Sequence, residues 1–357
     1  MLRATVAYCN HAHRLRLPRR HVAGPVVVNM DSAPPPDLAA VLAAWMASPV
    51  ADLVILLGIV GYLALVLRFR RHGQRWAPLR TSSAVAAVVL LVLVVNGPLD
   101  VYSHHLFWVH MIVHLILITV VPALLVWAQP IRLLRDAGGP VVGDRVDRFR
   151  HRRAFRWLIS PRLTVPLYAA VLVLTHLTGF QEAMSQHGWI HDGELILYLV
   201  AGYLLLLPLV GDELTTDPPL AHLLKFVVLA ICMFPDTLVG IVLMMTTSPL
   251  APAYAASRDW GPSAIVDQAT AGAVMWFGGD GLMMVLMVVV GGRWVSRGDR
   301  AGGGLGPWLD GVRRGATLGA DAPSDDSVDV DDDDAALAAY NARLAALHEG
   351  SIRREGR

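Results

Sequence analysis

Long, nearly uncharged apolar runs constrain this chain more than any other feature of its sequence. Hydrophobic residues make up 55% of the 357 residues and charged residues only 17%, and the apolar residues cluster in runs rather than in the short alternations of a soluble domain. Each run approaches the roughly 20 residues that a helix needs to cross a bilayer. The sequence therefore predicts an all-α membrane protein, a bundle of about seven transmembrane helices near residues 50–67, 84–95, 106–128, 163–180, 194–210, 220–244 and 269–290.

Cysteine usage and missing motifs exclude several function classes. Cys9 and Cys232 form no CxxC pair, so thiol-based metal capture and a disulfide framework are not expected. The chain contains no Walker loop, no GxGxxG in the right context and no GxSxG elbow, which leaves nucleotide hydrolysis and serine chemistry without support. We expect neither enzyme activity nor a nucleic-acid partner.

The loops between the runs differ sharply in charge. Three segments are rich in arginine, namely 68–80, 130–162 and the residues after 290, whereas 96–105, 181–193 and 246–268 carry almost no Lys or Arg. Because basic loops stay on the cytoplasmic side, seven spans place the N-terminus outside and the C-terminus in the cytoplasm. The protein is thus expected in the plasma membrane as a multi-pass protein.

Three regions follow from this pattern. Residues 1–45 form an N-terminal tail whose arginines contradict the predicted orientation, so we expect the true start at Met30 or Met46, with a tolerated basic tail as the alternative. Residues 46–295 form the membrane domain. Residues 296–357 form a cytoplasmic tail in which DDSVDVDDDD repels itself and AALAAYNARLAALHEG has helical periodicity.

The stretch from Asp100 to Gln129 carries the strongest chemical signal. His110 and His114 are four residues apart and share one helix face, with Met111 beside them. Imidazoles inside a membrane are costly unless they are paired, hydrated or bound to a ligand, so they suggest a functional site. His104 and His105 lie just before the span, where contact with water alone could explain them.

Further ionisable residues fall in the same outer half of the membrane. They are His176 in the fourth span, His187 and His191 in the following outer loop beside Glu194, Asp236 in the sixth span and Asp280 in the seventh. Imidazole with thioether sulfur suits Cu(I), and imidazole with carboxylate suits Cu(II) or zinc. A copper site open to the outside is one interpretation. A buried hydrogen bond for His176, solvation of the loop histidines, and a structural bond or proton relay at the aspartates remain open.

One segment resembles a known family. SHHLFWVHMIVHLILITVVPALLVWAQP is similar to the histidine-rich third segment of the CtaG-type cytochrome c oxidase assembly factors, with matches at His110, Met111, His114, Pro122 and Pro130. FQEAMSQHGWIHDGELILYLVAGYLLLLPLVGDEL and WGPSAIVDQATAGAVMWFGGDGLMMVLMVV resemble later family segments in the same order. The resemblance covers roughly residues 50–295 and part of the tail.

The resemblance implies a role in maturing the copper-bearing subunits of cytochrome c oxidase. Its implied ligands are His110, Met111, His114, His187 and His191. Two positions depart from the family pattern. Glu194 lies where many members carry a further histidine, and Asp280 lies where glutamate is common.

We therefore expect a copper-handling assembly factor whose partners are oxidase copper subunits and the lipid bilayer, with homo-oligomerisation left open. Two alternatives remain. His114 and His176 on facing helices could ligate a b-type haem in an oxidoreductase. A copper or proton-coupled transporter would instead need polar groups through both halves of the bilayer, and the inner half here is poor in them.

Overall fold

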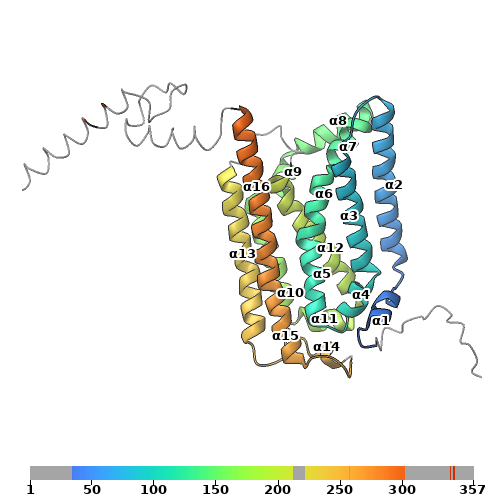
Figure 1. Ribbon diagram of the computed structural model, residues 1–357, viewed down its shortest axis with the longest axis vertical. Coiled ribbons are helices and arrows are strands. Elements are labelled where there is room, and N and C mark those ends of the chain that lie inside the picture. Colours follow the sequence, from blue (N-terminus) through green and yellow to red (C-terminus); the bar gives the residue numbers. More distant parts are fainter. Residues whose placement is uncertain (1–33, 212–221, 257, 302–337, 339–340, 342–357) are drawn as a thin grey trace, which may run out of the picture.

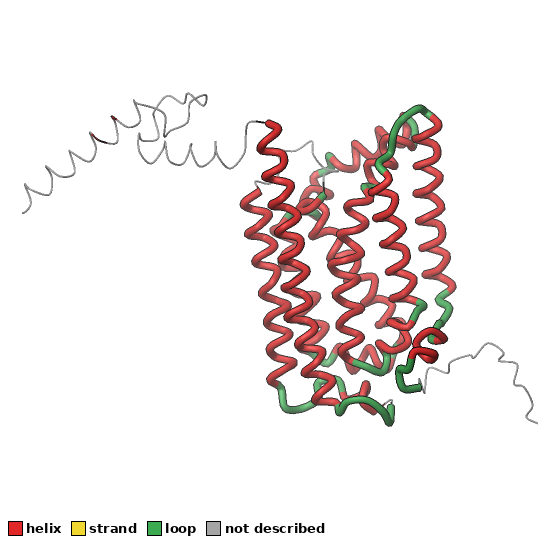
Figure 2. The backbone as a smooth tube through the Cα atoms, in the orientation of Figure 1, coloured by secondary structure: helices red, strands yellow, loops and turns green. Residues whose placement is uncertain are grey.

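The computed structural model describes residues 34–211, 222–256 and 258–301, together with residues 338 and 341. The Met30 start lies outside this part, and so does the predicted tail helix apart from residues 338 and 341. The described residues form helices and connecting loops without a strand (Figure 2). The helices are α1 Leu38–Ala43, α2 Pro49–Arg71, α3 Pro78–Val95, α4 Pro98–Ser103, α5 Phe107–Leu115, η1 Ile116–Val120, α6 Val121–Ala128, α7 Pro130–Ala137, α8 Pro140–Arg150, α9 Arg153–Leu158, α10 Pro161–Leu177, α11 Phe180–Gln186, α12 Gly188–Val210, α13 His222–Met245, α14 Pro252–Ala256, α15 Ala264–Ala273, η2 Val274–Gly278 and α16 Gly279–Ala301.

Six helical stretches of the described chain are long and apolar enough to cross a membrane: α2, α3, α5 to α7, α12, α13, and α15 to α16. The protein is thus a multi-pass, all-α membrane protein, as the sequence predicts. The remaining candidate, α10, has 17 residues, about 25 Å at 1.5 Å per residue, against a hydrocarbon core of about 30 Å. A seventh span stays a prediction.

Helix starts follow local chemistry that the apolar pattern alone does not reveal. Proline opens α2, α3, α4, α7, α8 and α10, because its fixed φ suits the first helical position and no hydrogen bond is lost there.

The expected start of the fifth span near residue 194 is wrong. His187 has extended backbone angles and α12 begins at Gly188, so His191 belongs to a helix rather than to a loop.

The helix from α5 to α6 forms the centre of the bundle, and its apolar side chains are mostly buried. Figure 1 shows this helix between α3 on one side and α13 and α16 on the other, with α2 at the edge. Two π-helical turns, η1 and η2, interrupt the two longest spans. Such turns widen a helix by one residue and often occur beside functional sites.

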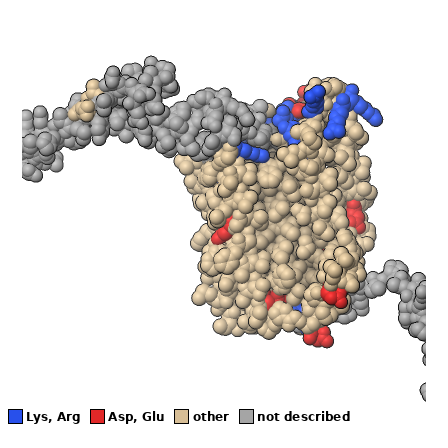
Figure 3. Space-filling model, in the orientation of Figure 1, with Lys and Arg blue, Asp and Glu red and all other residues tan. Residues whose placement is uncertain are grey.

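Charge separates the two ends of the bundle. Figure 3 shows most of the visible Lys and Arg side chains at the end where α7 and α8 lie, whereas the opposite end shows several acidic side chains and little basic surface; a few acidic side chains also lie between the two ends and among the basic ones. The candidate histidines of α4, α5 and α12 lie toward the acidic end. This separation agrees with the predicted orientation, which itself remains a prediction.

Gly202 allows the closest helix approach in the structure's centre. A Cβ atom added there would lie 1.9 Å from the Ile118 carbonyl oxygen in η1. We expect Gly202→Ala to destabilise the folded protein by at least about 1–3 kcal/mol, the range for overpacking a core, measured as a lower unfolding midpoint in detergent. Gly193→Ala, on the same helix with open space around the added Cβ, is the control and should leave the midpoint unchanged or raise it slightly, because alanine favours a helix more than glycine does.

Candidate metal site

Three buried side chains converge at the centre of the site. His110 and His114 project from one face of α5, and Glu194 projects toward them from α12. His110 Nε2 lies 3.5 Å from Glu194 Oε2, and His114 Nε2 lies 3.4 Å from Glu194 Oε1. All three residues are at most 1% exposed. We call His110, His114 and Glu194 the inner triad.

The triad's spacing suits a metal ion. Its three ligand atoms lie within 4.8 Å of one another. Two ligands about 2.1 Å from an ion at the tetrahedral angle are about 3.4 Å apart, close to both carboxylate–imidazole distances. Both His110 nitrogens, His114 Nε2 and Glu194 Oε2 have no hydrogen-bond partner within the described residues. Buried polar atoms normally have one, so these atoms point to a ligand.

Hydrogen bonds around His176 decide which His114 nitrogen is available. His176 Nδ1 lies 2.8 Å from the Leu172 carbonyl oxygen, which can only accept, so Nδ1 carries the proton. The lone pair of His176 Nε2 then accepts from His114 Nδ1 at 3.2 Å. A neutral His114 therefore presents a lone pair at Nε2 toward the Glu194 carboxylate. These two acceptors repel unless a cation, either a proton or a metal ion, lies between them.

Met111 and Tyr198 complete the inner end of the site. Met111 Sδ lies 3.1 Å from His176 Nε2 and is fully buried. The Tyr198 ring stacks on His114 with a centroid distance of 4.0 Å, and the Tyr198 hydroxyl lies 2.6 Å from Thr175 Oγ1. These contacts hold the His114 and His176 rings in place, as outer partners of metal-binding histidines do.

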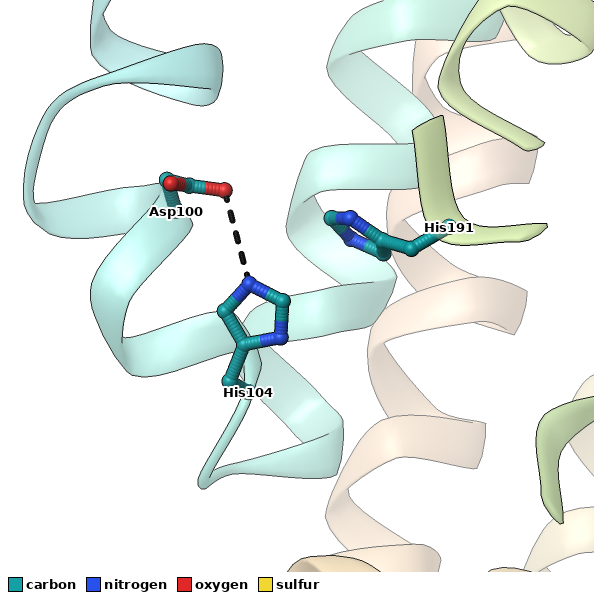
Figure 4. A group of neighbouring side chains, drawn as sticks. All are labelled: Asp100, His104 and His191. Atoms are coloured by element: carbon teal, nitrogen blue, oxygen red, sulfur yellow. Dashed lines mark ion pairs between the residues drawn. The ribbon is translucent and has the colours of Figure 1, made fainter. Parts of the chain in front are cut away.

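A second group lies between the inner triad and the acidic end of the bundle. Figure 4 shows Asp100, His104 and His191 facing one another across α4 and α12. His104 Nε2 is 3.8 Å from Asp100 Oδ1, and the His104 and His191 ring centroids are 4.7 Å apart. Ligand atoms of all three also lie within 4.8 Å of one another. We call Asp100, His104 and His191 the outer triad.

The outer triad has charge states suited to a metal ligand set. Two effects lower the pKa of His104 to about 3: burial of the imidazole is the larger, and the neighbouring His191 is the next. The His104 imidazole is therefore neutral and has a lone pair at neutral pH. Burial of the Asp100 carboxyl group and, to a smaller extent, the negative charge of Asp192 raise the pKa of Asp100 to about 7. A bound cation would favour the ionised form of this carboxyl group.

The imidazoles form a continuous series from the rim inward. The side chain of His104 is 31% exposed, whereas His191 is 6% exposed and the deeper histidines at most 1%. The His191 and His110 ring centroids are 5.8 Å apart, those of His110 and His114 4.2 Å, and those of His114 and His176 5.1 Å. The series thus joins the accessible outer triad to the buried inner triad.

Comparison with known proteins assigns the family. The sequence model of the cytochrome c oxidase caa3 assembly factor family (Caa3_CtaG) matches residues 60–297. The chain belongs to this family. The match includes every histidine of the site, from His104 to His191, so the family and the imidazole series occupy the same part of the chain.

The curated relatives of this family member are mycobacterial. An uncharacterized protein of Mycobacterium leprae is 27% identical over 344 residues, covering 93% of this chain and 49% of the relative. An uncharacterized protein of Mycobacterium bovis is 26% identical over 281 residues, covering 74% of this chain and 41% of the relative. The chain thus spans at most about half the length of these relatives. No solved structure matches it.

Not every predicted site residue of this family member reaches the cluster. His187 is exposed at the start of α12, with its Nδ1 3.2 Å from the Ala183 carbonyl oxygen. His105 is buried, but its ring faces Trp260 at a centroid distance of 6.5 Å. Neither residue is a member of the two triads, which instead include Glu194.

The two membrane aspartates have hydrogen-bond partners of their own. Tyr168 donates to Asp236 Oδ2 at 2.8 Å, and Thr237 donates to Asp280 Oδ2 at 2.9 Å. The other carboxylate oxygen of each has no hydrogen-bond partner among the described residues. These hydrogen bonds agree with a structural role for the two aspartates, whereas a role in a proton relay is untested.

Two residues that position α5 escaped the sequence interpretation. Asp267 accepts hydrogen bonds from the Phe107 and Trp108 backbone N–H groups at 3.2 and 3.1 Å, which caps the start of α5. Arg258 Nη2 lies 2.9 Å from Asp267 Oδ2, and its Nε donates to the His105 carbonyl oxygen at 2.8 Å. Asp267 and Gln268 are the Asp-Gln pair of WGPSAIVDQATAGAVMWFGGDGLMMVLMVV, the last segment that resembles the family. This pair was the signal in the sequence that could have identified Asp267.

The outer triad was also only partly predicted. Asp100 is four residues before His104, the spacing of neighbours on one helix face. That spacing was a usable signal, although nothing local shows that α12 brings His191 to the same place.

Proposed function

We propose that this protein supports cytochrome c oxidase assembly by binding copper on the extracytoplasmic side, as cargo for the copper-bearing subunits. The observation that carries the proposal is the inner triad, where His110 Nε2, His114 Nε2 and Glu194 Oε2 lie together without a hydrogen-bond partner among the described residues. Imidazole and carboxylate ligands suit Cu(II). The extracytoplasmic placement rests on the predicted orientation.

The two triads support an ordered uptake of the ion. The outer triad, with partly exposed His104, would receive copper first, and the His191–His110 contact would bring it to the inner triad. Deeper still, Met111 adds a thioether sulfur beside His176, which suits Cu(I). The protein's own contribution is to bind, orient and shield the ion rather than to catalyse a reaction.

The alternatives receive less support. Axial imidazoles hold a haem from opposite faces of its macrocycle, whereas His114 Nδ1 and His176 Nε2 contact each other at 3.2 Å. A transporter needs a polar path through the inner half of the membrane. Inward of the site, the buried side chains of η1 and α12 include several apolar ones, among them Leu117, Ile118, Leu205 and Leu206.

The cellular role is tested by complementation. In a bacterial strain that lacks this gene, we expect the wild-type gene to restore copper-loaded oxidase. The His110→Ala/His114→Ala gene should restore only a small fraction of it, measured as oxidase copper and activity in isolated membranes. A His187→Ala gene is the control, because His187 lies outside both triads. Full restoration by the double variant would contradict the proposal.

A further inference from the structure

A cavity of about 500 Å³ lies at the arginine-rich end of the bundle, away from both triads. Its walls come from the start of α3, the end of α6, Val210 at the end of α12, and α16. Figure 1 shows the α5–α6 helix running between α3 and α16, and three residues of α6 line this cavity. We call it the α3–α16 cavity.

Two arginines and an apolar wall give the α3–α16 cavity an amphiphilic character. Arg80 is near the start of α3, where its guanidinium lies over the Trp76 ring at 4.5 Å. Arg293 is near the end of the α16 span, 5.9 Å from the Trp127 ring centroid. Val289 is one turn before Arg293, about 6 Å deeper into the membrane. Positive charge therefore lies at the level of the headgroups and apolar side chains below it.

Unpartnered polar atoms in the same cavity point to a ligand. Trp127 Nε1 and Gln129 Oε1 are buried and have no hydrogen-bond partner in the described part of the chain. Gln129 has a left-handed backbone, with φ of 54°, at the break between α6 and α7, and its side chain lines the cavity. An indole N–H donates and an amide oxygen accepts, so together they suit a phosphate oxygen and a hydroxyl group.

We propose that the α3–α16 cavity binds one anionic glycerophospholipid from the leaflet at the arginine-rich end. Basic pockets between transmembrane helices are a known way to bind anionic headgroups. The phosphate would lie between Arg80 and Arg293 and accept from Trp127, a headgroup hydroxyl would donate to Gln129, and the acyl chain would cover Leu124 and Val289. This site is independent of copper binding.

The test measures lipid affinity of the full-length, delipidated protein by native mass spectrometry in detergent. The probes are phosphatidylglycerol, phosphatidylcholine with the same acyl chains, and glycerol 3-phosphate. The cavity variant is Arg80→Gln/Arg293→Gln, and the matched control is Arg68→Gln/Arg70→Gln, which removes two exposed arginines from the last turn of α2. Leu124→Trp keeps both arginines but fills the apolar part, and it decides the question if the double variant fails to fold.

We expect phosphatidylglycerol to bind the wild type and the control variant with equal affinity. It should bind the cavity variant and Leu124→Trp with an affinity lower by on the order of tenfold or more. Phosphatidylcholine should bind the wild type on the order of tenfold more weakly than phosphatidylglycerol. Equal binding of the two lipids, or equal phosphatidylglycerol binding by wild type and Leu124→Trp, would overturn the proposal. Glycerol 3-phosphate binding as tightly as the whole lipid would show an anion site without a lipid.

Discussion

Replacing Glu194 with glutamine is expected to lower copper affinity by at least about 10- to 100-fold, because even outer partners of metal ligands contribute that much. The carboxylate lies 3.5 Å and 3.4 Å from the two imidazole nitrogens and is the only negative charge in the inner triad. Glutamine keeps the shape and can donate its amide N–H to a histidine lone pair. The folded protein without copper should therefore be at least as stable as the wild type.

Asp144→Asn is the control for this prediction. It removes the same charge, but Asp144 is exposed in α8, at the arginine-rich end away from both triads. Copper affinity would be measured by competition with a chelator of known affinity, and stability by thermal unfolding. An unchanged affinity in Glu194→Gln would show that the carboxylate pairs with a proton and does not bind copper.

Asp267→Ala is expected to lower the free energy of unfolding by about 3–5 kcal/mol, the usual cost of removing one partner of a buried ion pair. The change leaves Arg258, whose side chain is 3% exposed, without its carboxylate. It also removes the acceptor for the first N–H groups of α5. Because α5 carries His110 and His114, the copper affinity of the remaining folded protein should also fall.

The double variant Asp267→Leu/Arg258→Met separates charge pairing from packing. Replacing both partners with apolar residues removes the uncompensated charge, so this variant should be less destabilised than Asp267→Ala. Arg132→Ala, which breaks a half-exposed pair with Asp136, should change stability by less than about 1 kcal/mol. A similarly small effect of Asp267→Ala would contradict a stabilising role for the Asp267 cap of α5 and its ion pair with Arg258.

Much of the fold could be predicted from hydrophobic length and charged loops. The third span expected at 106–128 agrees with the helix from Phe107 to Ala128, because apolar length and membrane thickness determine such a segment. The start of α12 was missed because its first turns are polar. His191 resembles a loop residue in sequence, yet it is buried, as Glu194 is, in the bundle interior, where polar side chains are tolerated next to partners.

The site was predictable along one helix and not between helices. The i, i+4 spacing of His110 and His114 follows from helix geometry, so the sequence indicates their shared face. The contacts of Glu194 with both imidazoles, of His191 with His104, and of His176 with Met111 depend on how α5, α10 and α12 pack. That packing depends in part on close contacts such as Gly202 against Ile118, which no local pattern encodes.

The most direct test of the central claim is the copper content of the purified wild-type protein beside His110→Ala/His114→Ala, with the visible spectrum recorded for both. Our account predicts roughly stoichiometric copper in the wild type and its loss in a double variant that remains folded. Normal folding without copper in either protein would contradict copper binding and leave the assembly role to a scaffold. A Soret band in the wild type would instead support the haem alternative.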